Sequence, residues 1–260
     1  MKLKQRIIYY KDELNDEFSK VKIVPRTIDG NYRYVRSRFL SFLLYRVVAT
    51  PLAFLYTKMV FGQRTVGKEK LSAAGKAGVF LYGNHTQASA DPLIPNLVMF
   101  PRKVYTICHP ANVSMPVFGS LMPYVGAVPL PDGMTAYRNF TACINRRINE
   151  KAVVTVYPEA HIWPYYTRIR PFPDTSFTYP AQLNAPVYCF TNTYKARKHR
   201  KKPRIVTYLD GPFYPDESLP VRQRAAALRE EVYRTMRSRS LLSDTEYIQY
   251  IRIEEGGNRP

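Results

Sequence analysis

The chain has 260 residues, of which 45% are hydrophobic and 23% are charged, so it can bury the core of one large domain and is not globally disordered. The formal net charge of +19 favours an anionic partner, which could be nucleic acid, an acidic membrane surface or a phosphorylated substrate. Three widely spaced cysteines without a CxxC pattern predict reduced thiols rather than a disulfide framework.

Residues 1–62 are predicted to form an N-terminal helical attachment. The first residues are basic and then acidic before any apolar run, which is not the pattern of a secretory signal. Residues 40–61 are the most apolar stretch, and about 20 such residues can cross a bilayer core. Arg46, Pro51 and Lys58 interrupt this stretch, and a charge near the bilayer centre costs at least about 2.5 kcal/mol.

We therefore expect two short amphipathic helices, hinged near Pro51, that lie in the membrane interface. Arg46 and Lys58 would then reach the lipid headgroups. The alternative is an amphipathic helix pair that packs on the core of its own domain.

Residues 63–240 are predicted to form an α/β domain with a mostly parallel sheet flanked by helices. Helical spacing of apolar residues marks two segments, 137–148 and 225–236. Short apolar strands alternate with such helices, which is typical of a sheet covered on both faces. No linker divides the domain, and residues 241–260 are left as a C-terminal tail. The strands are expected at 77–82, 103–108, 126–130, 152–157, 185–190 and 204–209.

The segment GNHTQASADP, residues 83–92, follows the first of these strands. In open α/β sheets, ligands bind at the carboxyl ends of the strands, which is where Asn84 and His85 are expected. A neutral imidazole can take a proton from a hydroxyl, and a carboxylate on its other nitrogen improves it as a base. Asp91 is the nearest carboxylate, and the pair can meet only if residues 86–90 loop back.

Both residues also have simpler interpretations. Asp91 followed by Pro92 is a typical helix start, with the aspartate as N-cap and the proline at the first helical position. His85 would then be a loop histidine whose hydrogen bonds are satisfied locally.

A second group of polar residues follows the strand at 152–157. If this strand neighbours the first, Glu159 faces the same edge of the sheet as His85, where it could bind a substrate hydroxyl or orient an arginine. His161 adds polar surface, and guanidinium groups at Arg168 and Arg170 match the oxygens of a phosphate. The alternatives are a capping carboxylate and a solvated basic loop.

Taken in order, these segments resemble the glycerolipid acyltransferases typified by 1-acyl-glycerol-3-phosphate acyltransferase. That family has Asn-His, four residues and Asp, whereas five residues separate His85 from Asp91 here. Each block alone is weak, but four blocks in order make a specific signal, and the likeness spans about residues 62–215. The other three blocks are similar to PVFGSLMPYVGAVPLPD (116–132), to Pro-Glu-Ala-His-Ile (158–162) with its trailing Pro-Phe (171–172) and Ser-Phe (176–177), and to Ala-Pro-Val (185–187).

The resemblance implies an O-acyltransferase of phospholipid synthesis. A fatty acyl group would pass from acyl-CoA, acyl carrier protein or acyl phosphate to a hydroxyl of a lysophospholipid, with 1-acyl-glycerol-3-phosphate as the leading candidate. His85 would be the base and Asp91 would orient it. The donor is a substrate, so no cofactor is expected, and no ligand spacing indicates a metal. The residues expected to contact substrate are Asn84, Glu159, His161, Arg168 and Arg170.

Two arginines that are thought to hold the acceptor phosphate in that family are missing. Leu130, Pro131 and Asp132 stand at the first position, and Ile162 stands at the second. We expect Arg168, Arg170 or Lys195 to replace them, unless the acceptor lacks this phosphate. The missing arginines bear on which acceptor is used more than on whether acyl transfer takes place.

The run KARKHRKKPR, residues 195–204, is the densest cluster of charge. If it is not simply a solvated loop, it is expected to contact anionic lipid headgroups, at about 1 kcal/mol per basic residue. Together with residues 40–61, it predicts a peripheral or monotopic protein on the cytoplasmic face of an anionic phospholipid membrane. The basic residues expected at the headgroups are Lys198, Arg200, Lys201 and Lys202.

The expected partners are that membrane, the lysophospholipid and the acyl donor, including an acyl carrier protein, but not nucleic acid. Two alternatives remain from the residues. One is a nucleic-acid-binding protein that uses the same charge. The other is an inactive member of the same fold that only binds membranes.

Overall fold

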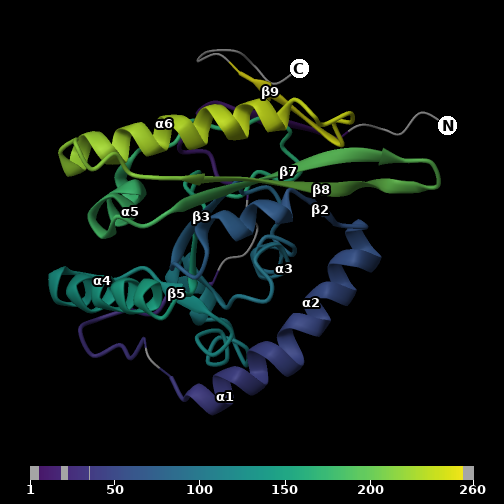
Figure 1. Cartoon of the computed structure of the whole chain (residues 1–260). Helices are drawn as coiled ribbons and strands as arrows, with labels where there is room; N and C mark the ends of the chain where they lie inside the picture. Colours follow the sequence, from purple (N-terminus) through teal and green to yellow (C-terminus); the bar gives the residue numbers. More distant parts are fainter. Residues whose placement is uncertain (1–5, 19–22, 35, 254–260) are drawn as a thin grey trace.

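The computed structural model describes residues 6–18, 23–34 and 36–253, and its centre is a seven-stranded sheet in the order β2-β8-β7-β3-β6-β4-β5 (Figure 1). All neighbouring strands are parallel except β7 and β8, which form an antiparallel hairpin. The six predicted strands are confirmed, and in this sheet the prediction missed the three-residue edge strand β2. The bounds are β2 Arg64–Val66, β3 Val79–Gly83, β4 Val104–Cys108, β5 Ala127–Pro129, β6 Val153–Val156, β7 Val187–Arg197 and β8 Arg200–Phe213.

Helices cover both faces of this sheet, as predicted. In the central strand β3, Phe80 and Tyr82 point into one apolar core and Val79 and Leu81 point into the other, so the strand is a continuous apolar run. The first core is closed by α4 (Met134–Asn149), α5 (Thr178–Leu183) and α6 (Val221–Ser240), and the second by α3 (Ile94–Val98). Short helical turns lie at η3 Lys68–Ala74, η4 Pro110–Val113 and η5 Thr175–Phe177.

The apolar segment before the sheet is one helix from Arg38 to Phe61, so the predicted hinge near Pro51 is wrong. Pro51 lies in the first turn of α2, directly after the wider π-helical turns of η1. These turns already change the hydrogen-bond register there, so the missing proline N–H does not break the helix. The helix runs through α1 Arg38–Phe42, η1 Leu43–Ala49, α2 Thr50–Tyr56 and η2 Thr57–Phe61.

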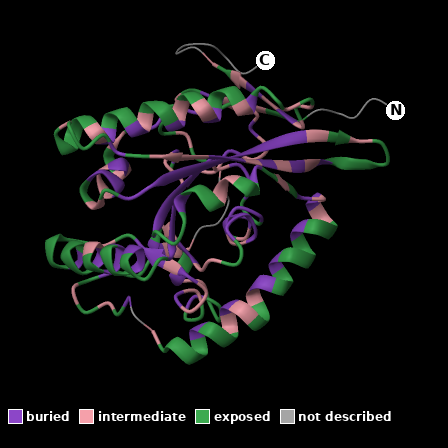
Figure 2. Cartoon of the chain, in the orientation of Figure 1, coloured by how far each residue is buried: buried purple, intermediate pink, exposed green. Residues whose placement is uncertain are grey.

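Figure 2 shows that this helix exposes most of one side to solvent. By length and composition it could cross a membrane: an 18-residue window within it has a mean hydropathy of 1.6, and 22% of that window is buried in the protein. Its buried side is largely small or polar, whereas its exposed side is apolar, which is the reverse of an ordinary surface helix. The buried positions include Ser41, Tyr45, Ala53 and Thr57; the exposed ones include Phe39, Phe42, Val47, Leu52, Phe54, Leu55 and Met59.

The rest of the N-terminal attachment is not helical where the structure describes it, so that part of the prediction is wrong. β1 (Arg6–Tyr10) pairs in parallel with β9 (Ile248–Arg252) in a separate two-stranded sheet. The predicted C-terminal tail is therefore folded back as well, up to residue 253. Both segments are held by a cluster of aromatic rings centred on Trp163, which no local pattern could reveal. The parts of these predictions at residues 1–5, 19–22, 35 and 254–260 lie outside the described residues.

Candidate active site

The site begins where β3 ends, at Gly83. A Cβ at this position would lie 2.1 Å from Cζ of Phe190, so the packed ring leaves room only for glycine. Asn84 follows and is 1% exposed. Its Oδ1 accepts the N–H of Asn192 at 2.8 Å, and its Nδ2 donates to the carbonyl of Asn192 at 3.1 Å. Asn84 thus ties β3 to β7. Both polar atoms of its buried amide are engaged there, which argues against its predicted role as a substrate ligand.

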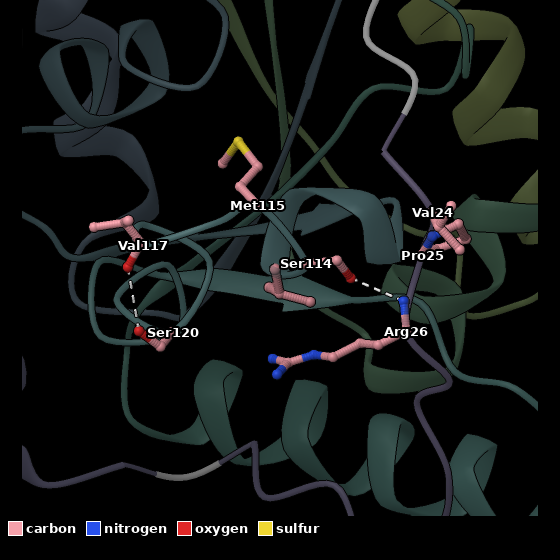
Figure 3. A pocket seen from close by; sticks show the side chains of 8 residues that line it. Val24, Pro25, Arg26, Ser114, Met115, Val117 and Ser120 are labelled. Atoms are coloured by element: carbon pink, nitrogen blue, oxygen red, sulfur yellow. Dashed lines mark hydrogen bonds between the residues drawn. The ribbon is translucent and has the colours of Figure 1, made fainter.

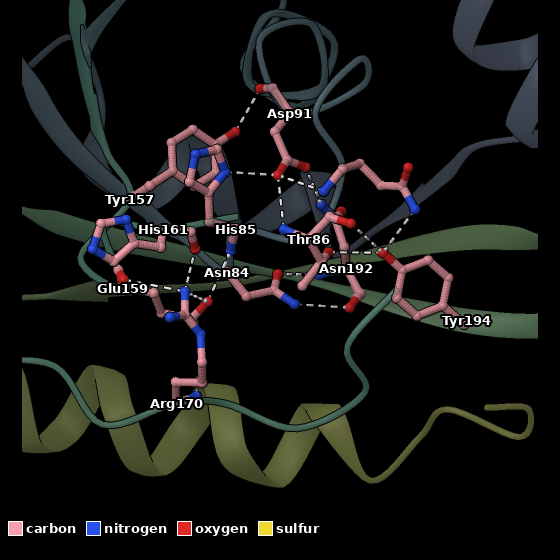
Figure 4. A network of polar contacts seen from close by, with 11 residues as sticks. Asn84, His85, Thr86, Asp91, Tyr157, Glu159, His161, Arg170, Asn192 and Tyr194 are labelled. Atoms are coloured by element: carbon pink, nitrogen blue, oxygen red, sulfur yellow. Dashed lines mark hydrogen bonds and ion pairs between the residues drawn. The ribbon is translucent and has the colours of Figure 1, made fainter. Parts of the chain in front are cut away.

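His85 and Asp91 meet beside this tie, as the loop-back prediction required (Figure 4). The distance between His85 Nδ1 and Asp91 Oδ2 is 2.8 Å. The backbone N–H groups of Thr86 and Gln87 donate to the same oxygen at 2.8 Å each, which closes the loop around the carboxylate. The helix-cap interpretation of Asp91 is wrong, because α3 begins three residues later with Leu93 at its N-cap position.

Burial sets the electrostatics of the pair. The side chain of Asp91 is fully buried, and desolvation raises the pKa of its carboxyl, although the hydrogen bonds from His85, Gln87 and Thr86 oppose this effect. The side chain of His85 remains 17% exposed. Because Nδ1 faces the carboxylate, Nε2 is the ring nitrogen left to take a proton from a ligand.

Tyr157, directly after β6, supports the pair and was missed in the sequence. Its ring stacks on the imidazole of His85, with centroids 4.4 Å apart, and its hydroxyl donates to the carbonyl of Asp91. Burial raises the pKa of Tyr157 well above its usual value, so the phenol keeps the proton that it donates. An aromatic residue at a strand end, just before Pro-Glu, was the available signal.

Glu159 lies next to His85, as predicted from neighbouring strands, but it holds the backbone instead of facing a substrate. Its Oε2 accepts the N–H of His85 at 3.1 Å, and its Oε1 accepts the N–H of Arg170 at 3.0 Å. Burial raises the pKa of the Glu159 carboxyl, and the nearby Arg170 guanidinium opposes this. With both oxygens engaged and the residue 4% exposed, Glu159 is placed to hold the backbone, which argues against its predicted role as a substrate ligand.

Arg170 is equally unavailable to a phosphate. It is 1% exposed, and its guanidinium lies 3.5 Å from the Glu159 carboxylate. It also donates to the carbonyls of Glu13, Glu159 and His161. The phosphate-binding prediction for Arg170 is therefore corrected to a role in holding this loop together.

The other predicted phosphate ligands differ in how free they are. Lys195 pairs with Asp244 at 3.7 Å. Arg168 is exposed, with its guanidinium 5.4 Å from the ring of Tyr166, and within the described ranges it has no carboxylate partner. His161 is half-buried beside Glu159 (Figure 4).

The residues predicted to contact the membrane are placed as follows. Lys58 is exposed on the last turn of the long helix, and Lys198, Arg200, Lys201 and Lys202 are exposed at the tip of the β7–β8 hairpin. Arg46 is instead turned toward the protein. Its guanidinium donates to the carbonyl of Pro101 and lies 5.6 Å from the rings of both Tyr45 and Phe100, which corrects its predicted role.

A cavity of about 510 Å³ lies apart from this network, between residues 24–26 and the loop at 113–120 (Figure 3). The hydroxyl of Ser114 accepts the N–H of Arg26 across it at 2.9 Å. None of the residues around His85 lines this cavity, so it is not part of the candidate site. Nor do the described residues contain a group of three His, Cys, Asp or Glu side chains that could hold a metal ion.

The structure thus places a His–Asp pair at the carboxyl end of a central strand in a mostly parallel sheet, which is a candidate acid–base site in an α/β protein. The chain belongs to the Acyltransferase family, whose model matches residues 62–192, about half of its length. It is therefore classed as an O-acyltransferase. The nucleic-acid interpretation of its charge has no support from this assignment.

A solved structure shares the fold. It is the 1-acyl-sn-glycerophosphate (LPA) acyltransferase PlsC from Thermotoga maritima, with a TM-score of 0.56 and 16% sequence identity. The similarity covers 80% of this chain and 88% of that one. A comparison with curated proteins gave no match.

Proposed function

We propose that this protein transfers a fatty acyl group from an activated donor to a hydroxyl of a lysophospholipid. The observation that carries the proposal is the His85–Asp91 pair, in which a fully buried carboxylate holds Nδ1 and leaves Nε2 free. Its family and its structural similarity to PlsC support the same reaction. The intact pair also argues against an inactive member that only binds membranes.

The mechanism follows from this geometry. Nε2 of His85 accepts the proton of the acceptor hydroxyl while the oxygen attacks the acyl carbonyl carbon. The new C–O ester bond forms, the bond from that carbon to the thiol or phosphate leaving group breaks, and the imidazolium returns the proton to the leaving group. Asp91 stabilises the imidazolium and fixes the Nδ1–H tautomer.

For the acceptor we propose 1-acyl-glycerol-3-phosphate, and for the donor acyl-CoA, acyl carrier protein or acyl phosphate, with no separate cofactor. Of the three cations proposed to replace the missing family arginines, Arg168 is the one that is exposed and has no carboxylate partner among the residues that the structure describes. A guanidinium fork is suited to a phosphate monoester. We accordingly propose Arg168 as its ligand.

We also propose that the protein docks on the cytoplasmic face of an anionic membrane. The long helix supplies the apolar surface, and the hairpin tip supplies the charge beside it. Arg200 Nη1 donates to the carbonyl of Met59 at 3.0 Å, and Arg197 Nη2 donates to that of Val60 at 2.9 Å. The tip is thus fastened to the last turn of the helix, which keeps apolar and basic groups on one fixed surface.

Membrane binding can be tested by replacing Leu52 and Leu55 with aspartate. Both are more than half exposed on the apolar side, so folding should be unaffected. Burying each leucine in lipid is worth about 1.5–3 kcal/mol, so the double variant should partition at least about tenfold less into phosphatidylglycerol-containing vesicles in a flotation assay. Met134→Asp with Leu241→Asp, also exposed, is the matched control. Unchanged flotation of the Leu52/Leu55 variant would refute helix docking.

The reaction is tested by offering the protein each acyl donor with a panel of lysolipids that differ in headgroup. We expect product with lysophosphatidate, and less product when Arg168 is replaced by glutamine. Product only with acceptors that lack a phosphate monoester would keep the reaction and exclude this acceptor. No transfer from any donor would refute the proposed function.

A further inference from the structure

A pair of polar residues interrupts the apolar core beneath the site. On β7 the residues that face this core are Phe190, Asn192 and Tyr194, and on β8 they are Ile205, Thr207 and Leu209. Asn192 and Thr207 are direct partners in the strand register and are 2% and 0% exposed. Burying polar groups costs free energy unless they are bonded, and the sheet itself needs only apolar residues here.

These two residues form a directed chain of hydrogen bonds that ends on the carboxylate of the pair. Gln63 Nε2 donates to Thr207 Oγ1 at 3.0 Å, and Thr207 Oγ1 donates to Asn192 Oδ1 at 2.7 Å. Asn192 Nδ2 donates in turn to Asp91 Oδ1 at 3.4 Å. Within the described part of the chain, this amide is the one hydrogen-bond donor to Oδ1, since the other three contacts are to Oδ2.

The direction of the chain follows from the chemistry of its members. An oxygen lone pair of the Thr207 hydroxyl accepts the N–H of Gln63, so the hydroxyl hydrogen of Thr207 is free to bond to Asn192. With Oδ1 of Asn192 occupied by that hydrogen, the NH₂ end of the amide must face Asp91. Without the hydroxyl, the amide could turn over and present its oxygen to a carboxylate, which is repulsive.

We propose that Asn192, oriented by Thr207 and Gln63, is a positioning residue that keeps Asp91 ionised and aligned with His85. This inference rests on the proposed function, since it assumes that the pair acts as the base. A donor to the carboxylate stabilises the unprotonated pair, so its loss makes the pair take up a proton more readily. When the pH is lowered, a variant without this donor should therefore lose activity at a higher pH than the wild type does.

The test is the pH dependence of kcat/KM for Thr207→Val, which removes the hydroxyl and keeps the shape. We expect the acidic limb of the profile to move to higher pH and kcat/KM at neutral pH to fall about tenfold, the size of one hydrogen bond to a charged group. Thr207→Ser keeps the hydroxyl and should restore the wild-type profile. The matched control is Thr191→Val on β7, because Thr191 is also fully buried but its hydroxyl has no partner within the described residues.

Two further variants keep the outcome interpretable. Gln63→Met should shift the acidic limb in the same direction by a smaller amount, which covers the case that Thr207→Val does not fold. A wild-type profile in folded Thr207→Val would overturn the inference, as would an equal shift in Thr191→Val. His85→Ala distinguishes a failure of the proposed function from a failure of this inference. If His85→Ala is as active as the wild type, the proposed base is wrong, whatever Thr207→Val does.

Discussion

His85→Ala should lower kcat/KM for acyl transfer by about 10³-fold or more, because it removes the group that accepts the hydroxyl proton. Nε2 is the nitrogen that the structure leaves unoccupied, while Nδ1 is held 2.8 Å from Asp91. The measurement is ester formation on the best lysolipid acceptor, with purified protein in detergent, so that membrane docking does not limit the rate.

The control for this variant is His109→Ala, at an exposed histidine that follows β4. It should keep nearly full activity. Comparable losses in both variants would point to a general effect of removing a histidine, and full activity of His85→Ala would remove the basis of the proposed mechanism. Binding of the acceptor should change little, so the loss is expected in kcat.

Asp91→Asn should reduce activity by about 10³-fold while the protein stays folded. The asparagine side chain has nearly the same shape, and the N–H groups of Thr86 and Gln87 would hold its oxygen in place of Oδ2. The negative charge that stabilises the imidazolium is then gone; in the best-known serine protease triad the same substitution costs about 10⁴-fold, there because the histidine takes the wrong tautomer. The loss is therefore chemical rather than structural.

Thermal unfolding distinguishes these causes. Burial raises the pKa of Asp91 above its ordinary value, so the folded state binds this proton more tightly than the unfolded state does. As the pH rises from the unfolded-state pKa of Asp91 to its higher folded-state pKa, the protein progressively loses stability. Above the folded-state pKa, the ionised carboxylate lowers the stability by the full amount. The neutral asparagine removes this cost, although its NH₂ would then face the Asn192 Nδ2 that donates to Oδ1 in the wild type, so the melting temperature at neutral pH should change little. A large drop in melting temperature would assign Asp91 to folding and not to catalysis.

The pair also sets the expected pH dependence of the wild type. Catalysis needs Nε2 of His85 free to accept a proton and Asp91 as a carboxylate, so activity should fall as the pH is lowered and the pair takes up a proton, which the acidic limb of kcat/KM against pH measures.

Apolar patterns determined much of the architecture. The strands at 77–82, 152–157 and 185–190 are short, apolar and bounded by breakers, and the structure places them side by side as β3, β6 and β7. A strand buried on both faces has to be apolar throughout, so its composition reveals it without any knowledge of its neighbours. The apolar stretch from residue 40 to residue 61 was recognised in the same way, although its continuous course past Pro51 involves π-helical turns that composition does not encode.

The sequence also predicted that His85 and Asp91 meet after the strand at 77–82, and the structure brings them together there, since residues at strand ends stay within a few positions of their strand. The sequence did not reveal which polar residues face outward. Glu159 and Arg170 were predicted to bind substrate, yet both lie inside the protein, where they hydrogen-bond to backbone groups and pair with each other. Whether a charged side chain meets a ligand or a carbonyl depends on what packs over it, and that is decided by distant segments.

The sequence by itself determined the α/β class, the strand-end position of the His–Asp pair and the presence of one apolar and one basic segment. Only the tertiary structure decided the rest: the pairing of β1 with β9, the stacking of Tyr157 on His85 and the hydrogen-bonded chain from Gln63 to Asp91. Local patterns reflect which residues are buried, because burial repeats with the period of a strand or a helix. Contacts between residues 63, 91, 192 and 207 carry no such period, because they form only where the folded sheet brings separate strands together.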